Sequence, residues 1–310
     1  MICTCTLNPS LDYYMEFDHR IEHGKTNRSQ LEYYEAGGKG MNVSIVLNNL
    51  LIPTRAFGFL GGFTRDFYVT LLQKYEYIQP NFTYIDGHTR INVKLHDTEG
   101  DSDVNAAGPY ITSTDMENLR NKVQRLDEGD YFVLAGVSPE YLSKDITDML
   151  KNIMANNVRV VLDTNPDIIA NTLSSKPFLI KTTPEELDEL AKLTGKNVSG
   201  KDEVIAAAKG ILEAGAQNVI VVINNEKAIL ACADGIYECE IKRDEKTVST
   251  VGTGDSLVAG FLMNYLRSSN AVDSFRFGAC CGSATAYSKG LATREKIDSF
   301  YETTTVEKIG

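Results

Sequence analysis

Features that would link the chain to a membrane or to nucleic acid are missing from the sequence. No apolar run reaches the roughly 18 residues that a membrane-spanning helix needs, so we expect no membrane span. The formal net charge is −11, whereas binding to nucleic acid requires a basic face. The segment from Met1 to Asn8 lacks the basic and apolar regions of a signal peptide. We therefore expect a cytoplasmic protein that binds neither nucleic acid nor a membrane.

The chain also lacks a cysteine and histidine pattern that would hold a metal. Its four histidines are scattered, and its cysteines form no Cys-x-x-Cys pair. The six cysteines are Cys3, Cys5, Cys232, Cys239, Cys280 and Cys281. We expect buried free thiols in a reducing cytosol, and no side chain that binds a metal directly.

Strand and helix patterns alternate through most of the chain. We predict buried strands at 2–7, 55–60, 131–135, 158–162, 178–181 and 218–223, and helices at 40–51, 67–75, 115–126, 143–156, from 184 and at 202–214. This alternation predicts an α/β fold, with a mostly parallel sheet covered by helices on both faces. We expect one domain over residues 1–310, because no linker interrupts the pattern. Ligands of such sheets bind outside the carboxyl ends of the strands.

Two polar segments do not fit this alternation. Residues 10–35 and 88–107 carry alternating apolar positions, most clearly from Arg90 to Leu95. We predict that they form a small β-sheet lid over one end of the main sheet. Exposed strands are prone to pair with other strands, so we expect a homodimer through the lid sheet.

A late glycine motif, Gly252, Thr253, Gly254 and Asp255, precedes a predicted helix at 256–266. Glycines let the backbone approach a ligand, and the free N–H groups of a helix start bind anions. A carboxylate in such a cradle makes sense as a base that takes a proton from an attacking hydroxyl, which describes phosphoryl transfer. The alternative is a plain turn in which Asp255 caps the helix. Gly260, in the helix interior, indicates close packing there.

An early glycine motif lies between the lid segments and the first helix. Gly37, Gly38 and Gly40 permit close backbone approach, and Lys39 and Asn42 supply donors at fixed offsets. The spacing is not that of a P-loop. A simple turn would explain the glycines but not Lys39 and Asn42 together.

With both motifs in this order, the chain resembles the ribokinase-like sugar kinases in their phosphofructokinase-B branch. The resemblance runs from Thr6 to Ser288 and implies a three-layer ribokinase-like fold. Within the branch, the segments 58–62 and 90–94, and Ala135 with Gly136 and Pro139, look most like 1-phosphofructokinases. Tagatose-6-phosphate kinases are close relatives with the same framework.

The resemblance also implies roles for individual residues. Asp255 would be the base, and the amides of Gly252, Thr253 and Gly254 would hold the transferring phosphoryl group. Sugar hydroxyls would be bound by Asp12, Gly38 and Asn42, and the sugar's own phosphate by Lys39, Arg90 and Arg28. Nucleotide binding would involve Lys181, Glu186 and Ser283, with Mg²⁺ held through ATP and water and Glu186 behind the water shell.

Four of these residues also have plain structural explanations. Asp12 could cap a turn after its strand, and Arg90 could be a solvated charge at a sheet edge. Lys181 could lie on the surface. Glu186 lies in an acidic first turn, which the helix dipole favours in any case.

The chain departs from the family pattern in four places. Thr253 replaces an alanine of the late motif, and Thr183 replaces an asparagine that orders Mg²⁺ waters. The substrate-facing serine of the turn after residues 131–135 is displaced by one position, to Ser138. From Val222 to Lys227, a serine and two glycines near the phosphates are missing.

These observations predict an ATP- and Mg²⁺-dependent kinase of a phosphorylated ketohexose, with fructose 1-phosphate as the first choice. Tagatose 6-phosphate and fructose 6-phosphate are alternative substrates. The four departures concern residues that bind or position the ligands, not the candidate base, and they can weaken nucleotide binding. A sugar-phosphate-binding regulatory protein with weak activity is therefore the non-enzyme alternative, although such a protein has no need of Asp255.

Overall fold

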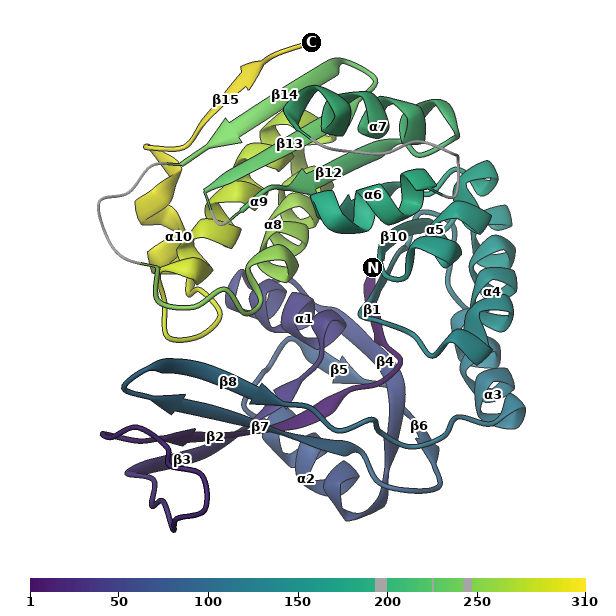
Figure 1. The fold of residues 1–310 in the computed structure, drawn as a ribbon. Coiled ribbons are helices and arrows are strands. Elements are labelled where there is room, and N and C mark those ends of the chain that lie inside the picture. Colours follow the sequence, from purple (N-terminus) through teal and green to yellow (C-terminus); the bar gives the residue numbers. More distant parts are fainter. Residues whose placement is uncertain (193–199, 225, 242–246) are drawn as a thin grey trace.

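The computed structural model describes residues 1–192, 200–224, 226–241 and 247–310 (Figure 1). Within these residues no helix is both long enough and apolar enough to cross a bilayer. The chain folds into a large sheet covered by helices and a small separate sheet, so the α/β class and the ribokinase-like layers predicted from the sequence are confirmed.

The described residues form an 11-stranded main sheet in the order β15-β14-β13-β12-β11-β10-β9-β1-β4-β5, with β6 paired to β4. Its strands are β1 (Ile2–Thr6), β4 (Thr54–Gly61), β5 (Ile78–Pro80), β6 (Thr83–Ile85), β9 (Tyr131–Ala135), β10 (Arg159–Asp163), β11 (Leu179–Thr182), β12 (Asn218–Val222), β13 (Lys227–Cys232), β14 (Gly235–Glu240) and β15 (Thr305–Lys308). The strands from β12 to β5 run parallel, as predicted. The antiparallel strands β13, β14 and β15 extend the sheet and were not predicted.

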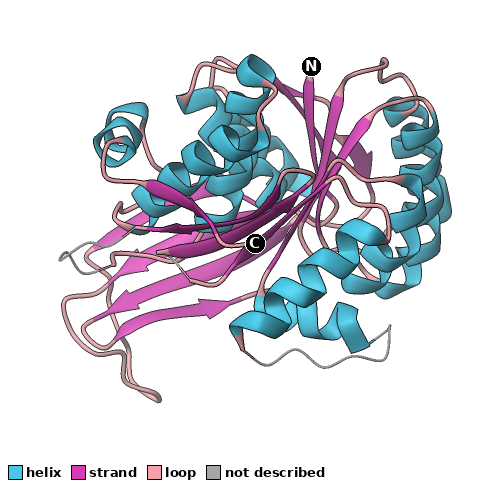
Figure 2. Ribbon diagram, turned by 90° about the horizontal axis from the view of Figure 1, so that it is seen from above, coloured by secondary structure: helices cyan, strands magenta, loops and turns pink. Residues whose placement is uncertain are grey.

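Helices cover both faces of the main sheet (Figure 2). They are α1 (Lys39–Asn49), α2 (Gly62–Leu72), α3 (Ser113–Val123), α4 (Ser143–Ala155), α5 (Pro166–Thr172), α6 (Pro184–Lys192), α7 (Lys201–Glu213), α8 (Thr253–Ser268), α9 (Ala271–Ala286) and α10 (Arg294–Tyr301), with short 3-10 turns at Glu140–Leu142 and Leu173–Ser175. Their apolar sides bury two large clusters against the sheet. Burial of apolar area drives folding. The two clusters therefore hold the helices against the main sheet and keep the sheet edge that carries the site residues in place.

The prediction of close packing at Gly260 is confirmed. A Cβ at Gly260 would lie 2.9 Å from the Cα of Gly278 in α9, so α8 and α9 meet backbone to backbone. Two predicted helix starts were late, because α2 begins at Gly62 and α8 at Thr253. In both cases a glycine stands at the observed start, because Gly62 is the first residue of α2 and Gly252 is the N-cap of α8.

The small sheet has the order β3-β2-β7-β8 and is referred to below as the lid sheet (Figure 1). Its strands are β2 (Ser10–Glu16), β3 (Leu31–Gly37), β7 (Arg90–Asp97) and β8 (Gly100–Val104). These ranges fall within or close to the two polar segments of the sequence. Residues that are paired across neighbouring strands lie on the same face of the lid sheet. One face is polar and includes Asp12 and Asn92, and the other is apolar and includes Tyr13 and Val93.

Candidate active site

A cluster of charged side chains lies at the carboxyl edge of the main sheet. Asp163 ends β10, and Lys181 lies in the neighbouring parallel strand β11. The Nζ of Lys181 and the Nζ of Lys39 each lie 3.2 Å from Oδ1 of Asp163. Lys181 is 6% exposed, so the alternative explanation that it lies on the surface is wrong.

Charges explain how Asp163 stays ionised although it is buried. Burial by itself raises the pKa of a carboxyl group. Here Lys181 and Lys39 outweigh burial, and the pKa of Asp163 is lowered. Burial likewise opposes the charge of Lys39, but Asp163, Asp255 and Glu186 raise the pKa of its ammonium group. Lys39 therefore lies among the carboxylates near Asp255.

Asp255 lies in the first turn of α8 and points at the early glycine motif. Its Oδ2 accepts a hydrogen bond of 2.8 Å from Nδ2 of Asn42. The N-cap of α8 is Gly252, and no side chain caps the helix, so the alternative in which Asp255 is a cap is wrong. Burial, together with the charge of Asp163, raises the pKa of Asp255 to about 6. A carboxylate with such a pKa is suited to accept a proton near neutral pH.

The start of α8 has the geometry of an anion cradle. Gly252 has a φ of 77°, a left-handed conformation that favours glycine. The first N–H groups of the helix, including those of Thr253 and Gly254, have no partner within the helix. A Cβ at Gly254 would lie 2.9 Å from Cε of Lys181, so a cation passes directly beside these amides.

Asp12 is held on the polar face of the lid sheet. Its Oδ1 accepts hydrogen bonds from Oγ of Ser10 at 2.6 Å and from Nδ2 of Asn92 at 3.1 Å. Burial raises the pKa of Asp12, while the Ser10 bond and the charge of Lys94 oppose this effect. Asp12 lies inside β2, so it does not cap a turn.

Arg90 starts β7, an inner strand of the lid sheet, and is therefore not an edge charge. Its guanidinium group donates to the carbonyl oxygens of Asn8 at 3.0 Å and Ala106 at 3.2 Å. Its Nε is buried without a hydrogen-bond partner among the described residues. Burial lowers the pKa of Arg90. The backbone thus fixes a cation that has no carboxylate in contact within the part of the chain that the structure describes, an arrangement suited to an incoming anion.

The remaining sequence candidates fall in different places. Gly38, with a φ of 123°, precedes α1, and its carbonyl oxygen accepts the N–H of Asn42 at 2.9 Å. Arg28 lies exposed in the loop between β2 and β3, which extends away from α8 (Figure 1). The structure therefore does not bring Arg28 together with Arg90 and Lys39 within one chain.

Glu186 and Thr183 form a reciprocal cap at the start of α6. Oε2 of Glu186 accepts the N–H of Thr183 at 2.9 Å, and Oγ1 of Thr183 accepts the N–H of Glu186 at 3.3 Å. This is the capping-box arrangement, so a structural role accounts for both residue types. Thr183 thus stabilises the helix that carries Glu186, although it replaces the family's asparagine.

The displaced serine does not face a cleft. Ser138 is 2% exposed, its Oγ lies 3.3 Å from Oγ1 of Thr164, and its N–H donates to Oδ1 of Asn165. The exposed residue of this turn is Val137.

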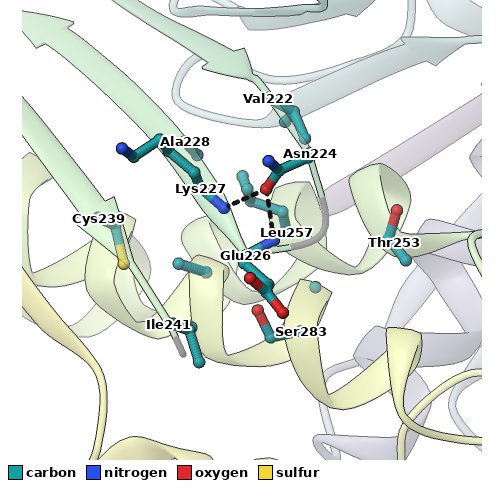
Figure 3. Close-up of a pocket in the computed structure, with 12 residues that line it drawn as sticks. Val222, Asn224, Glu226, Lys227, Ala228, Cys239, Ile241, Thr253, Leu257 and Ser283 are labelled. Carbon is teal, nitrogen blue, oxygen red and sulfur yellow. Dashed lines mark hydrogen bonds between the residues drawn. The ribbon is translucent and has the colours of Figure 1, made fainter. Parts of the chain in front are cut away.

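A pocket lies beside Thr253, between α8, α9 and the strands β13 and β14 (Figure 3). It is lined by Val222, Asn224, Glu226, Lys227, Ala228, Cys239, Ile241, Thr253, Leu257, Ala279, Gly282 and Ser283. The predicted cofactor residue Ser283 is thus in its wall, and so are described residues of the Val222–Lys227 departure. Position 225 of that departure lies outside the described residues.

Sequence reasoning missed Asp163 and Lys94. Asp163 directly follows the predicted strand 158–162, and Lys181 is the last residue of the predicted strand 178–181, so the rule that ligands bind at strand ends could have found Asp163 as well. Lys94 lies opposite Tyr14 on the polar face of the lid sheet and pairs with Asp103 at 2.6 Å. Lys94 could have been found from the alternation of residues 90–95, because this alternation places Lys94 on the same face as Asn92 and Arg90.

The site offers oxygen ligands but no complete metal cage. Within the described residues, no group of three or more histidine, cysteine or acidic side chains could hold a metal ion. However, Oδ2 of Asp163 is buried and has no hydrogen-bond partner there. Carboxylate oxygens in small number fit Mg²⁺, which keeps most of its waters and usually arrives with substrate phosphates.

Comparisons with known proteins identify the family of the chain. A model of the family described as pfkB family carbohydrate kinase matches residues 6–297. The chain is 37% identical to 1-phosphofructokinase of Bacillus subtilis, over 96% of both chains. It is 30% identical to D-tagatose-1-phosphate kinase of Bacillus licheniformis, again over 96% of both. Its fold matches the crystal structure of phosphofructokinase-2 from Escherichia coli with a TM-score of 0.90, at 23% identity and over 97% and 98% of the two chains.

Proposed function

The chain belongs to the pfkB family of carbohydrate kinases, and from this premise we propose that it phosphorylates fructose 1-phosphate with ATP to give fructose 1,6-bisphosphate and ADP. A kinase of this family is a phosphotransferase that acts on a hydroxyl group. The observation that carries the proposal is the 2.8 Å contact between Asn42 and Asp255, which joins two glycine motifs that are 213 residues apart. Relatives named 1-phosphofructokinase support this choice of sugar.

In the proposed reaction, the free primary hydroxyl of the sugar attacks the γ-phosphorus of ATP. Asp255 accepts the hydroxyl proton as the new O–P bond forms and the bond to ADP breaks. The amides of Gly252, Thr253 and Gly254 stabilise charge on the transferring group, with Lys181 beside them. Lys39, which we first expected at the sugar's own phosphate, is positioned by Asp163 to act on this same charge.

The lid sheet would hold the other end of the sugar. Asp12 and Asn42 would accept and donate hydrogen bonds to sugar hydroxyls, at the backbone of Gly38. Arg90 would bind the phosphate that the sugar already carries, because its guanidinium group is fixed and has no carboxylate in contact. Arg28 would contribute only through movement of its loop or in an assembly.

The nucleotide would bind on the side of the active site that Lys181, Glu186 and Ser283 form. Mg²⁺, bound with ATP, would supply charge neutralisation of the phosphates, held through waters by Asp163 and Glu186. Six buried, unpaired thiols suit a reducing compartment, so we place the protein in the cytoplasm, where ATP is also available.

ADP release is the experiment that tests this function. The purified protein would be assayed with ATP, Mg²⁺ and a panel of fructose 1-phosphate, tagatose 1-phosphate, tagatose 6-phosphate and fructose 6-phosphate. We expect the highest kcat/KM with fructose 1-phosphate. Comparable binding of these sugars without ADP release would instead support a regulatory sugar-phosphate-binding protein.

Tagatose 1-phosphate is the second candidate, because a relative with 30% identity over nearly the whole chain is named for it. The two sugars differ only in configuration at C4, and both carry their phosphate on C1. This relative replaces our sequence-based alternative, tagatose 6-phosphate, as the better-supported one. A kcat/KM at least tenfold higher with tagatose 1-phosphate would decide in its favour.

We further propose a homodimer through the lid sheet. One row across its four strands consists of Tyr34, Tyr13, Val93 and Val104. Tyr13 and Tyr34 stack at 4.4 Å, and Tyr34 and Val104 remain 38% and 58% exposed. An apolar face of this kind, on a sheet with two free edges, is a surface that a second copy would cover.

A further inference from the structure

The pocket beside the start of α8 lies between two helices, α8 and α9, and two strands, β13 and β14. Apolar side chains form its walls, and Thr253 of the anion cradle lies at one end (Figure 3). The apolar wall residues are Val222, Ala228, Ile241, Leu257 and Ala279. Gly282 lets α9 pack against the start of α8, because a Cβ there would lie 2.9 Å from the carbonyl oxygen of Thr253. A nucleobase has two apolar faces and a polar edge, so the polar groups of the pocket decide which base it accepts.

Those polar groups come from the loop that departs from the family pattern. Oδ1 of Asn224 accepts the N–H groups of Glu226 at 2.9 Å and Lys227 at 2.8 Å, which holds the turn. Oε1 of Glu226 accepts a hydrogen bond of 2.9 Å from the hydroxyl of Tyr287. In Figure 3 the carboxylate of Glu226 points into the pocket toward Ser283.

We propose that Glu226 reads the 6-position of the purine and so selects adenine over bases with a 6-oxo group. The inference rests on the proposed ATP-dependent function, because it assigns a base-selecting residue to the nucleotide site. Tyr287 is the positioning residue, since its hydroxyl donates to Oε1 of Glu226, and among the described residues Oε2 has no hydrogen-bond donor and can accept one from the ligand.

The chemistry of the purine edge gives the direction of the preference. An ionised carboxylate can only accept hydrogen bonds. Adenine presents its 6-amino group as a donor, whereas guanine presents O6, an acceptor. A 6-oxo base would place two acceptors against each other and leave both without a donor. Unpaired polar groups in a binding site reduce affinity strongly, so we expect a preference of about 10- to 100-fold.

ATP and inosine triphosphate are the appropriate pair of probes, because they differ only at the 6-position and in the proton on N1. We would measure kcat/KM for both at saturating sugar phosphate. The wild type should prefer ATP by about 10- to 100-fold. Glu226→Gln should lower this ratio at least tenfold, mainly by improving the inosine nucleotide, because a carboxamide can donate to O6.

Two further variants separate base reading from a general loss of structure. Tyr287→Phe removes the positioning hydroxyl and should lower the ratio less than Glu226→Gln does, with little change in kcat for ATP. Glu213→Gln, at the exposed end of α7, makes the same chemical change far from the pocket and should leave the ratio as in the wild type. Calorimetric titration with ADP and inosine diphosphate gives the same comparison without catalysis.

The outcomes distinguish this inference from the proposed function. A ratio in Glu226→Gln within twofold of the wild-type ratio overturns the base-reading role, whatever the activity. A wild type that uses both nucleotides equally well is a kinase without this selectivity, and it also overturns that role. A wild type that binds neither diphosphate overturns both proposals. Selective ADP binding that Glu226→Gln abolishes supports base reading even if no sugar in the panel is phosphorylated.

Discussion

At the scale of single residues, two carboxylates and two ammonium groups account for the electrostatics of the site. Asp163 is shared by Lys39 and Lys181, and Asp255 lies close enough for the charge of Asp163 to raise its pKa. The negative charge of Asp163 therefore serves two purposes. It fixes two cations beside the anion cradle, and it keeps Asp255 basic enough to accept a proton.

Replacement of Asp255 by asparagine tests the role of this carboxylate as a base. Asparagine keeps the shape and the contact with Asn42 but cannot accept the hydroxyl proton. We expect kcat to fall about 10³-fold, within the range that a general base contributes, while sugar and ATP still bind. Steady-state kinetics and calorimetry would measure the two effects. Activity within tenfold of wild type would exclude proton abstraction by Asp255.

The pH dependence of kcat should report the pKa of Asp255. A base is active when deprotonated, so kcat should rise with pH through about 6 and then level off. In Asp163→Asn, a neighbouring negative charge is lost, so the pKa of Asp255 should fall and the rise should move to lower pH. Initial rates from pH 4.5 to 8 would measure the midpoint. An unchanged or higher midpoint in the variant contradicts this coupling.

At the scale of elements, the start of α8 combines three functions that the sequence shows only as a glycine motif. It exposes free amides, presents Asp255 from its first turn and leaves room for Lys181 beside Gly254. The close contact of α8 with α9 at Gly260 and Gly278 holds this helix start in place. The strand ends supply the opposing charges, because β10 and β11 run parallel and end at the same edge.

Gly254→Ala tests whether this room is required. The added Cβ would lie 2.9 Å from Cε of Lys181, so the lysine must move away from the cradle and from Asp163. We expect kcat to fall about 10-fold or more, the effect of a lost charged contact, with stability within about 1 kcal/mol of wild type. Gly210→Ala in α7 is the matched control, because nothing lies within 4 Å of its added Cβ. That variant should be fully active and slightly more stable in thermal unfolding, and equal activity of the two variants would argue against the contact.

At the scale of the whole molecule, the main sheet carries the residues proposed for phosphoryl transfer and the lid sheet carries the residues proposed to bind the sugar. The polar face of the lid sheet holds Asp12, Asn92 and Lys94, and its apolar face remains partly exposed. Contacts between the body and the lid sheet include Nζ of Lys289 with a carboxylate oxygen of Glu16 at 3.8 Å, the hydroxyl of Tyr68 with the carbonyl oxygen of Gly37, and the ring of Phe67 with that of Tyr34. Assembly through the apolar face would therefore also determine how the lid is held over the site.

The proposed dimer predicts twice the chain mass of 34.2 kDa in solution. Val104→Asp places a charge in the apolar row of the lid sheet, and we expect it to shift the mass toward that of one chain. Leu51→Asp, at another exposed apolar position after α1, should remain dimeric. Analytical ultracentrifugation at micromolar concentration would compare the three proteins. A wild type with the mass of one chain would contradict the proposal.

The sequence by itself determined local features: the strands β1, β4 and β9 to β12, the helices α1 to α4 and α6 to α8, the positions of the glycine motifs and the candidate base. These follow from hydrophobic period and from residue types within a few positions of each other. It did not determine β13 to β15, because antiparallel pairing at the end of a sheet leaves no mark in the helix-strand alternation.

Only the tertiary structure decided which distant groups share the site. The link from Lys39 to Asp163 spans 124 residues, and the link from Asn42 to Asp255 spans 213. The structure also showed that Asp255 does not cap its helix, that Lys181 is buried and that Arg28 lies apart from Arg90. Such facts depend on how the sheet order and the helix packing bring the segments together, and on the burial that shifts each pKa, neither of which a local pattern contains.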